Sequence, residues 1–593
     1  MKSVFGPPAP RIAALCIIVC LGCLSLFAQD LDEVTISGRI TDSNGDPVVG
    51  ARILVTLAST GARRNAVSKA NGRYSLIELL PGIYKLTVSA TGFGDKQTDE
   101  LTTISGQHFR LNFSLSPATV TAEQTINISE DNAPVIDTTR TVVGGTITQD
   151  EIEELPNTSN DVLDLVFTLG QTAEEPLSIR NLAGDDRIGK GSERDQPSGV
   201  IGAGSVSLAG GAAYSTNITI DGLDNNDDRL AQERFQPSID SVAEVQVITN
   251  QFSAEYGRAS GGRINIRTRA GARKFRGRFS MFFEDDGLNA NTFNNNRRGL
   301  SRLPFTEYEP GGTLSGPVPF WYFKDRTFFF SSYSYRDRDA TTQIFTALPL
   351  DQNPRFVLPA PTNPETARSD LNEPGSALIA SYIARASTPQ RRQRFTQRLD
   401  HNFTDNHNIT INYQRGRSDG FRQYRETTRF LEETLQGRIR DNDSFYITDN
   451  YVVNSNVVNQ VRFLYSDYRP NFATNNPLGP VVLLRLIDET LIGNPDRISG
   501  TVVVGNSTGN FARLRNEKRY QFQETANFVV GEFNLRFGAD IQRIDSTNNE
   551  LRDTTGTFNF ENADGFLGNE VVRYRRNSGA VSELKNTYSG FFA

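Results

Sequence analysis

The second half of this 593-residue chain alternates apolar and polar residues over strand-length segments, and its apolar positions are rich in aromatic residues. From 394 to 404, Phe395, Leu399 and Phe403 share one face, while Arg, Thr, Asp and Asn side chains occupy the other. A two-residue period identifies β-strands. An aromatic face opposite a face of charges and amides is typical of strands that meet lipid on one side and a polar interior on the other.

The pattern begins after Lys274 and recurs in several segments. In Phe275–Glu284 the aromatic positions fall on one face, with Phe282 as the exception. The segment 534–543 sets Leu535, Phe537, Ala539 and Ile541 against Asn534, Arg536, Asp540 and Gln542. A β-sandwich also alternates, but its polar face lies outside and its apolar face packs on a second sheet.

The connections between these segments alternate in length. "TDNH" and "NSN" are very short, whereas 338–393 and 468–518 are long. Tight turns at one end and long loops at the other are the signature of outer-membrane barrels. Closure of such a barrel satisfies every backbone hydrogen bond in lipid.

The N-terminus indicates export. Basic residues precede an apolar run, Ile12–Phe27, that ends before the small residue Ala28, so residues 1–28 are predicted to be a signal peptide. A lipoprotein signal acylated at Cys23 is an alternative, although Cys20 stands where an aliphatic residue is wanted. All three cysteines lie in this segment. Without a later apolar run of about 18 residues, the exported chain is either soluble outside the inner membrane or a barrel.

Residues 31–116 read as short strands between glycine and proline turns. Turns are predicted at Asn44-Gly45, Asn71-Gly72 and Pro81-Gly82, and Phe109, Leu111, Phe113 and Leu115 alternate near the end. This spacing predicts a small β-sandwich. The pieces "SGRITDSNGDPVVGARI", "ANGRYSL" and "LPGIYKLTVSATGF" resemble the carboxypeptidase regulatory-like domain, of transthyretin-like fold. The resemblance implies a non-catalytic module, either a periplasmic spacer or a sugar binder.

Residues 117–271 are predicted to form an α+β plug. "DEIEELP" and "NDVLDLVFTL" indicate one or two short helices, and Gly261-Gly262 predicts a sharp turn into a strand. "STNITIDGLDNND" and "SVAEVQVITNQFSAEYGRASGGRINIRTRAG" resemble the plug core of TonB-dependent outer-membrane receptors. "GGTLSGPVPFWYFKDRTFFFSSYSYRDR" resembles the first barrel hairpin of the Oar-like subgroup, which carries an N-terminal carboxypeptidase regulatory-like domain.

The family resemblance implies a barrel of about 22 strands filled by the plug. It also implies a partner, TonB of the inner-membrane energising complex, which pulls on a periplasmic segment of the receptor. By position, the TonB-box candidate is Thr119, Val120, Thr121 and Ala122. A TonB box adds an edge strand to TonB's sheet, which suits Thr and Val. The alternative is an ordinary final strand or linker.

Residues 272–593 hold roughly ten to twelve strands of about ten residues, half of what a plugged barrel needs. The sequence runs to its last residue inside an apparent strand, "KNTYSGFFA". We therefore expect the N-terminal fragment of a receptor with a mainly β fold. The incomplete antiparallel barrel should be an open, curved sheet partly wrapped around the plug, with its last strand on an edge.

Enzyme and metal motifs are incomplete. Gly184, Gly189 and Lys190 match the start of a P-loop, but Gly191 stands where the metal-binding Ser or Thr belongs. The acidic run 221–228 lacks the EF-hand glycine, and Phe235 stands where the bidentate Glu would be, so a solvated plug turn is favoured over a calcium site. His108, His401 and His407 are scattered. We predict no enzyme, no catalytic residue, no metal and no cofactor.

The Arg-rich stretch "QRRQRF", residues 390–395, reads as a loop or the start of a strand that could attract anions in the lumen. The net charge of −7 argues against nucleic acid as a partner. The predicted function is TonB-powered transport into the periplasm, from the outer membrane, with the sandwich on the periplasmic side. The alternatives are a surface-binding, adhesion or export-related protein of the same architecture, or a secreted soluble β-protein. The substrate, whether small molecule, oligosaccharide or peptide, and its binding residues cannot be read.

Overall fold

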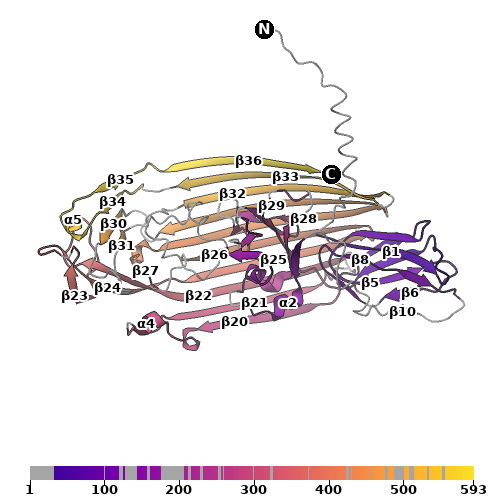
Figure 1. Cartoon of the computed structure of the whole chain (residues 1–593), viewed down its shortest axis with the longest axis horizontal. Helices are drawn as coiled ribbons and strands as arrows, with labels where there is room; N and C mark the ends of the chain where they lie inside the picture. Colours follow the sequence, from indigo (N-terminus) through magenta and orange to yellow (C-terminus); the bar gives the residue numbers. More distant parts are fainter. Residues whose placement is uncertain are drawn as a thin grey trace, which may run out of the picture.

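The computed structural model describes residues 32–593 apart from 99, 119–123, 127–142, 157–159, 175–205, 212–214, 228–231, 251–254, 258, 298, 321–324, 372, 422–426, 429, 455, 475–478, 487–499, 506–512, 531–532 and 551–553. Figure 1 shows three parts along the long axis. A β-sandwich lies at one end, a plug lies beside it, and a long curved sheet runs over the plug to the opposite end.

The sandwich consists of two sheets. One has the order β4-β1-β8 with β9 also on β1, and the other has the order β10-β6-β5-β2-β3 with β7 on β5. The strands are β1 (Val34–Asp42), β2 (Arg52–Leu57), β3 (Arg63–Val67), β4 (Arg73–Leu79), β5 (Gly82–Ser89), β6 (Lys96–Thr98), β7 (Leu101–Thr103), β8 (His108–Arg110), β9 (Phe113–Leu115) and β10 (Gln124–Ile126). Alternate residues of both sheets, such as Ile36 and Leu86, are fully buried between them.

The alternating segment 109–115 forms two short strands rather than one. The break falls where the chain crosses Gly38, because a Cβ there would lie 1.7 Å from the carbonyl oxygen of Leu111. The side chain of Asn112 instead accepts the backbone N–H of Arg39, at 2.8 Å. Glycine at 38 is therefore a requirement of the close backbone approach.

The plug is built on a mixed sheet of order β11-β18-β19-β14-β15. Its strands are β11 (Val143–Ile147), β14 (Thr216–Ile220), β15 (Leu223–Asp224), β18 (Val242–Asn250) and β19 (Gly262–Thr268). Two short helices pack on it, α2 (Gln149–Glu154) and the 3₁₀ helix η2 (Val162–Thr168), as expected from the sequence. Thr148 and Glu151 close a capping box on α2. The smaller elements are β12 (Thr172–Glu174), β13 (Val206–Leu208), β16 (Asn226–Asp227), β17 (Gln232–Glu233) and η4 (Ile239–Ser241).

The large sheet has the strand order β20-β21-β22-β25-β26-β28-β29-β32-β33-β36, and neighbours along this order pair antiparallel. The strands are β20 (Arg276–Asp285), β21 (Phe305–Pro317), β22 (Thr327–Pro349), β25 (Gln390–Thr404), β26 (His407–Phe421), β28 (Gln436–Asn454), β29 (Val457–Thr474), β32 (Arg513–Val530), β33 (Phe533–Glu550) and β36 (Ala580–Phe592). Short turns follow β25 and β28, and long connections follow β26 and β29. The predicted asymmetry of turns and loops is confirmed.

The two faces of the large sheet are inverted relative to a soluble protein. In β25 the guanidinium of Arg398 and the carboxylate of Asp400 are buried, whereas Leu399 and Phe403 are 36% and 44% exposed. In β33, Arg536 is buried between exposed Leu535 and Phe537. Polar side chains therefore face the plug and apolar side chains face outward, as the alternation predicted.

Most strands of the large sheet are longer than the expected ten residues. β22 has 23 residues and β28 has 19. We call the large sheet that curves over the plug the wall. The extra length of β22 lies beyond this wall, because residues 341–349 leave β25 and pair with β24 (Leu378–Ser387) and β27 (Thr427–Thr428). Its two ends therefore belong to different layers of the molecule.

The long connections build a layer of their own at the end opposite the sandwich (Figure 1). We call it the outer layer. It contains β23 (Asn363–Ser369), β24, β27, η6 (Glu432–Thr434), β30 (Val481–Leu486), β31 (Gly500–Gly505), β34 (Thr557–Phe560), α5 (Ala563–Leu567) and β35 (Arg573–Arg575). Its apolar core joins Ile344, Leu431, Leu484 and Phe560 from four connections.

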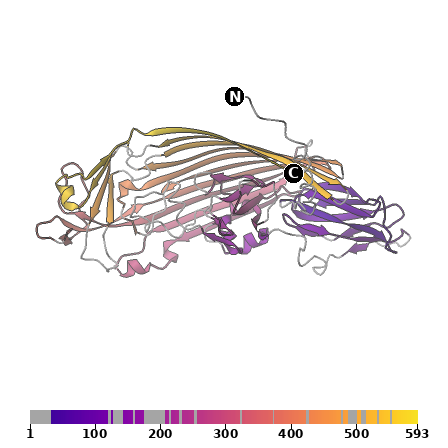
Figure 2. The same ribbon diagram turned by 45° about the horizontal axis from the view of Figure 1, so that its top comes forward.

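The sheet is open, as expected. Among the described residues, β20 pairs only with β21 and β36 only with β33. Figure 2 shows the sheet curving over the plug as a trough. No helix in the described parts of the chain has both the length and the apolar character of a membrane span.

Candidate functional site

Sandwich, plug and wall of the large sheet meet at a buried charge cluster, which we call the junction. Its centre is Asp32, two residues before the start of β1. Arg263 of β19 donates to both carboxylate oxygens, at 2.8 and 3.1 Å, and the Nδ2 of Asn265 donates to Oδ1 at 3.2 Å. A nitrogen of Arg462, on β29, lies 3.6 Å from Oδ2. One aspartate thus links all three parts.

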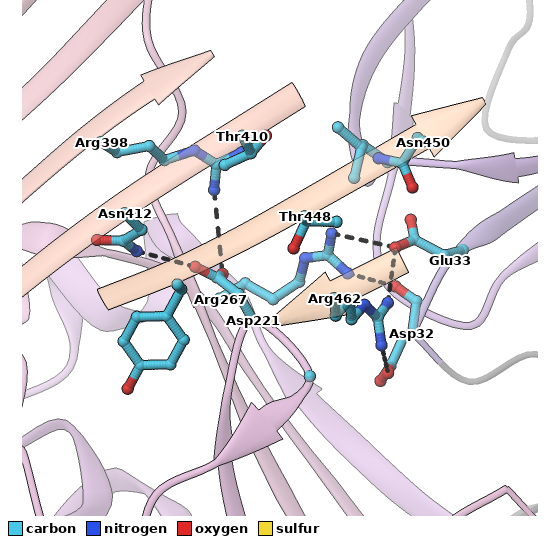
Figure 3. A pocket seen from close by; sticks show the side chains of 13 residues that line it. Asp32, Glu33, Asp221, Arg267, Arg398, Thr410, Asn412, Thr448, Asn450 and Arg462 are labelled. Atoms are coloured by element: carbon cyan, nitrogen blue, oxygen red, sulfur yellow. Dashed lines mark hydrogen bonds and ion pairs between the residues drawn. The ribbon is translucent and has the colours of Figure 1, made fainter. Parts of the chain in front are cut away.

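A second ion-pair set surrounds Glu33. Its Oε1 lies 3.6 Å from Arg462 and 3.8 Å from Arg267 of β19. Arg267 also lies 3.8 Å from Glu244 of β18, and both Ser105 N–H and Ser105 Oγ donate to that carboxylate from the sandwich turn after β7. Figure 3 shows Arg267 and Arg462 directed at the Asp32-Glu33 pair.

Apart from Arg267, whose side chain is 14% exposed, the side chains of the junction are almost completely buried. Burial, the largest single effect, acts to lower the pKa of the Arg263 guanidinium, but Asp32, Tyr256 and Glu255 together outweigh it, so the pKa lies above its usual value. Burial is likewise outweighed at Arg267 by Glu33, Glu244, Asp221 and Asp32 together, and its pKa is also raised. Both guanidiniums therefore stay charged. A buried pair of this kind is costly to break from one side, because the remaining charge is left without a counter-ion.

The cluster continues along the plug through Asp221. Its carboxylate accepts from the N–H and the hydroxyl of Thr268, at 2.9 and 2.7 Å, and from Asn412 on β26, at 3.0 Å. Arg398 of the wall lies 3.9 Å away and is held mainly by Asp400, at 2.9 Å. Between Asp221 and Glu33 the side chains leave a cavity of about 30 Å³, which has room for one or two water molecules (Figure 3).

Further along the wall, β32 supplies three plug contacts at alternate positions. Arg515 pairs with Asp227, Arg519 pairs with Asp224, and Glu517 pairs with Arg234. All six side chains are almost completely buried. The plug and the wall are thus joined by complementary charges rather than by a shared apolar core.

A third contact between plug and wall lies just before η2, where Asn160 Nδ2 donates to Glu309 Oε2 at 3.3 Å. Asp161 accepts the N–H of Leu163 at 3.0 Å and the side-chain amide of Gln236. Burial, reinforced by Asp164, raises the pKa of Asp161 to about 6. Arg394 of β25 pairs with Glu309 of β21 beside it.

The structure corrects the expectation for the acidic run 221–228. It is a plug turn, but it is not solvated: Asp224, Asn225 and Asp227 are at most 3% exposed. The carboxylates are buried because arginines of the wall meet them. The described residues contain no group of three or more His, Cys, Asp or Glu side chains that could hold a metal ion.

Other predicted residues fall in different places. "QRRQRF" starts β25, and its Arg394 is neutralised by Glu309 instead of facing an open lumen. The rings of His401 and His407 both contact Phe403, with centroids 4.5 and 4.8 Å away. The TonB-box candidate Thr119–Ala122 and the P-loop-like residues 184–191 lie outside the described residues.

Sequence reasoning assigned no role to the junction residues. Asp32 and Glu33 are an acidic pair immediately before the first strand, and Arg263 and Arg267 punctuate the apolar residues of "GGRINIRT". Arginines in an otherwise apolar strand were a sequence signal that could have indicated these buried ion pairs. Their partners lie more than 200 residues apart, so the pairing itself was not readable.

The comparisons with known proteins agree with this architecture. A family described as "Carboxypeptidase regulatory-like domain" matches residues 35–116, and one described as "Outer membrane beta barrel domain" matches 267–356 and 349–593. The chain is 24% identical over 341 residues to the TonB-dependent transporter Oar of Myxococcus xanthus. That alignment covers 56% of this chain and 30% of the relative, so the chain spans about a third of the relative's length.

The solved structures that the chain is similar to include the outer membrane transporter YddB from Escherichia coli. It has 11% identity and a TM-score of 0.47, and the match covers 76% of this chain and 54% of that one. The siderophore receptor PirA from Acinetobacter baumannii has 13% identity and a TM-score of 0.39, covering 70% and 49%. Because the barrel model matches more than half of the residues, the chain belongs to the outer membrane beta barrel domain family and resides in the outer membrane.

Proposed function

We propose that this protein is a TonB-dependent receptor that moves a substrate through the outer membrane into the periplasm. The observation that carries the proposal is the way the plug is held. Among the described residues its apolar core is almost entirely its own, with only Tyr446 and Leu464 contributed by the wall. Its attachment to the wall consists of discrete ion pairs, at Asp221, Asp224 and Asp227 among others.

Such an attachment suits a part that must move as a unit. An apolar interface would expose a large surface on separation, whereas paired charges exchange their partners for water when a path opens. Each buried pair costs several kcal/mol to break. That is a barrier which thermal motion rarely crosses and which an applied pull can overcome.

The junction connects the sandwich to the plug, so a force applied to one can reach the other. The TonB-box candidate Thr119–Ala122 lies in the chain between the sandwich strands β9 and β10, and a force on it acts on a sandwich that Asp32 and Glu33 clamp to the plug. TonB, on the periplasmic side with the sandwich, is the partner we propose. The relative named as a TonB-dependent transporter supports the same assignment.

Deleting Thr119–Ala122 tests the proposal. A strain without the gene is first compared with its parent on a panel of single carbon, nitrogen and iron sources. The deletion variant should fail on the same source as the null strain while reaching the outer membrane in normal amount. A control that deletes residues 130–133 removes the same number of residues from the segment between β10 and β11 and should grow normally. Parental growth of the Thr119–Ala122 deletion would reject import and favour a surface-binding, adhesion or export role.

A further inference from the structure

The sandwich contacts the wall as well as the plug, through a strained segment near the end of β4. Glu78 has a φ of +56°, in the left-handed region that side chains other than glycine rarely adopt. Around it the register between β1 and β4 shifts, so Leu76 belongs to the sandwich core whereas Ile77 packs on Val452 and Val458 of the wall. Backbone strain of this kind persists where it positions a contact, and here the contact is with the wall.

The docked sandwich closes the seam between the plug and this side of the wall. It contacts β19 of the plug and both β29 and β33 of the wall, at one end of the molecule (Figure 1). The cavity left there, between Asp221 and Glu33, has a volume of about 30 Å³. Sites for small molecules occupy about 300–1,000 Å³. A substrate therefore cannot leave along this seam while the sandwich is docked.

Short hydrogen bonds hold the sandwich to the plug. Arg263 donates to both carboxylate oxygens of Asp32, at 2.8 and 3.1 Å. Ser105 donates to Glu244 with its N–H, at 3.3 Å, and with its hydroxyl. Gln246 Nε2 donates to the Ser105 carbonyl at 3.3 Å. Because hydrogen bonds to charged groups are the strong ones, the sandwich and the plug are expected to move together.

The ion pairs between the sandwich and the wall are longer. A nitrogen of Arg462 lies 3.6 Å from Asp32 and another lies 3.6 Å from Glu33, and Arg536 lies 4.0 Å from Glu78. If the sandwich leaves the wall, Asp32 and Glu33 keep the arginines of β19 as partners. Separation from the plug would instead take the Asp32 carboxylate away from a buried arginine, which is the costlier step.

We propose that the sandwich is a gate at the periplasmic end of this seam, which opens by separating from the wall while it stays on the plug. The gate rests on the proposed import function, because the pull of TonB on residues 119–122 would open it. The Arg273 N–H donates to the Ser59 carbonyl at 2.8 Å and ties the sandwich to the connection between β19 and β20. The sandwich turns about this tie as its contacts with β29 and β33 open.

The test measures thiol access at three single cysteines, since residues 29–593 contain no cysteine of their own. Ile77→Cys reports the wall contact and Ser105→Cys reports the plug contact. Val67→Cys, at a side chain that is 52% exposed, is the accessible control. Cells growing on the source identified by the import experiment receive N-ethylmaleimide with or without a protonophore. Ile77→Cys should react at least tenfold faster in energised cells, whereas Ser105→Cys should stay slow and Val67→Cys fast in both conditions.

The purified protein in detergent gives a second measurement that needs neither TonB nor a proton gradient. Arg462→Gln removes a wall partner but leaves Asp32 and Glu33 paired with the plug. It should speed the modification of Ile77→Cys at least tenfold and leave Ser105→Cys unchanged. Arg417→Gln, at an exposed arginine of β26, should change neither rate.

The gate is overturned if Arg462→Gln does not speed the modification of Ile77→Cys, or if Ser105→Cys reacts faster to the same extent, because the sandwich would then leave the plug. It is also overturned, while import stands, if energy does not change the Ile77→Cys rate in cells whose growth requires residues 119–122. If the deletion of 119–122 grows normally, import is rejected and the purified protein alone decides whether the sandwich opens at the wall.

Discussion

At the scale of single residues, charged side chains are buried and paired where the sandwich, the plug and the wall meet. Asp32 and Arg263 are 231 residues apart and nearly inaccessible to solvent. The sequence shows that each belongs to a strand or its edge, but charge pairing at this separation depends on how three folded parts come together. The ion pairs of the site therefore could not be predicted from sequence patterns.

Asp32→Asn should release the sandwich from the plug. The change keeps the shape but leaves Arg263 buried beside a neutral amide, a loss of about 3–5 kcal/mol for a broken buried pair. The N–H of Ser105 bonds across the same interface, to Glu244, at 3.3 Å. Hydrogen exchange of the peptide 101–108 should accelerate about 100-fold or more, since each tenfold is about 1.4 kcal/mol. Asp95→Asn, at an exposed sandwich position, should change nothing; equal exchange in the two variants would contradict the clamp.

The plug should lose stability as the pH rises. Burial raises the pKa of Glu233 to about 8, with Arg440 opposing the shift. The folded state therefore holds a proton that the unfolded state releases above its ordinary value near 4.5. This stability is complete below about pH 4.5 and is lost as the pH rises towards and through 8, by at most about 1.4 kcal/mol per pH unit.

Thermal unfolding in detergent between pH 5 and 9 checks this sign. Glu233→Gln cannot release a proton and should flatten the profile between pH 6 and 8, while the exposed control Glu154→Gln should follow the parent. The part of the profile below pH 6 should persist in Glu233→Gln, because Asp161 titrates there. Parallel curves for the parent and Glu233→Gln would show that Glu233 is ionised in the folded protein throughout.

At the scale of elements, the two-residue period predicted most of the fold. The wall strands follow it because one face meets lipid and the other meets the plug, so alternation is a direct physical requirement. The outer layer escaped prediction for the opposite reason. Its core draws Ile344, Leu431, Leu484 and Phe560 from connections far apart in the chain, and no single run is long enough to show a period. The connections 338–393 and 468–518 were accordingly read as loops.

The two faces of β32 give the element-scale prediction. Phe522 is 43% exposed and points outward, whereas Thr525 is 2% exposed and faces the plug. In reconstituted bilayers, a bimane fluorophore on Phe522→Cys should be quenched several-fold more strongly by doxyl-labelled phospholipid than one on Thr525→Cys. Both positions share one strand, so differences in insertion cancel. Equal quenching would mean that the exposed aromatic face is not a lipid face.

At the scale of the whole molecule, the arrangement is a trough-shaped sheet that holds a plug by charge, with a sandwich at one end and a folded outer layer at the other (Figure 2). The order of these parts along the chain was predictable from motifs, because each part has a local sequence pattern. Their mutual contacts were not. The proposed function depends on those contacts, since energy from TonB must pass from residues 119–122 through the junction to the plug.

The most direct measurement is a cross-link to TonB in living cells. A photoreactive amino acid placed at Val120 should form a product that contains both this protein and TonB, because the segment 119–122 is proposed to add a strand to TonB's sheet. The same residue at Val357, which is 82% exposed in the outer layer, should give no such product. Absence of a TonB product at each of positions 119–122, or an equal yield at 357, would contradict TonB-coupled transport.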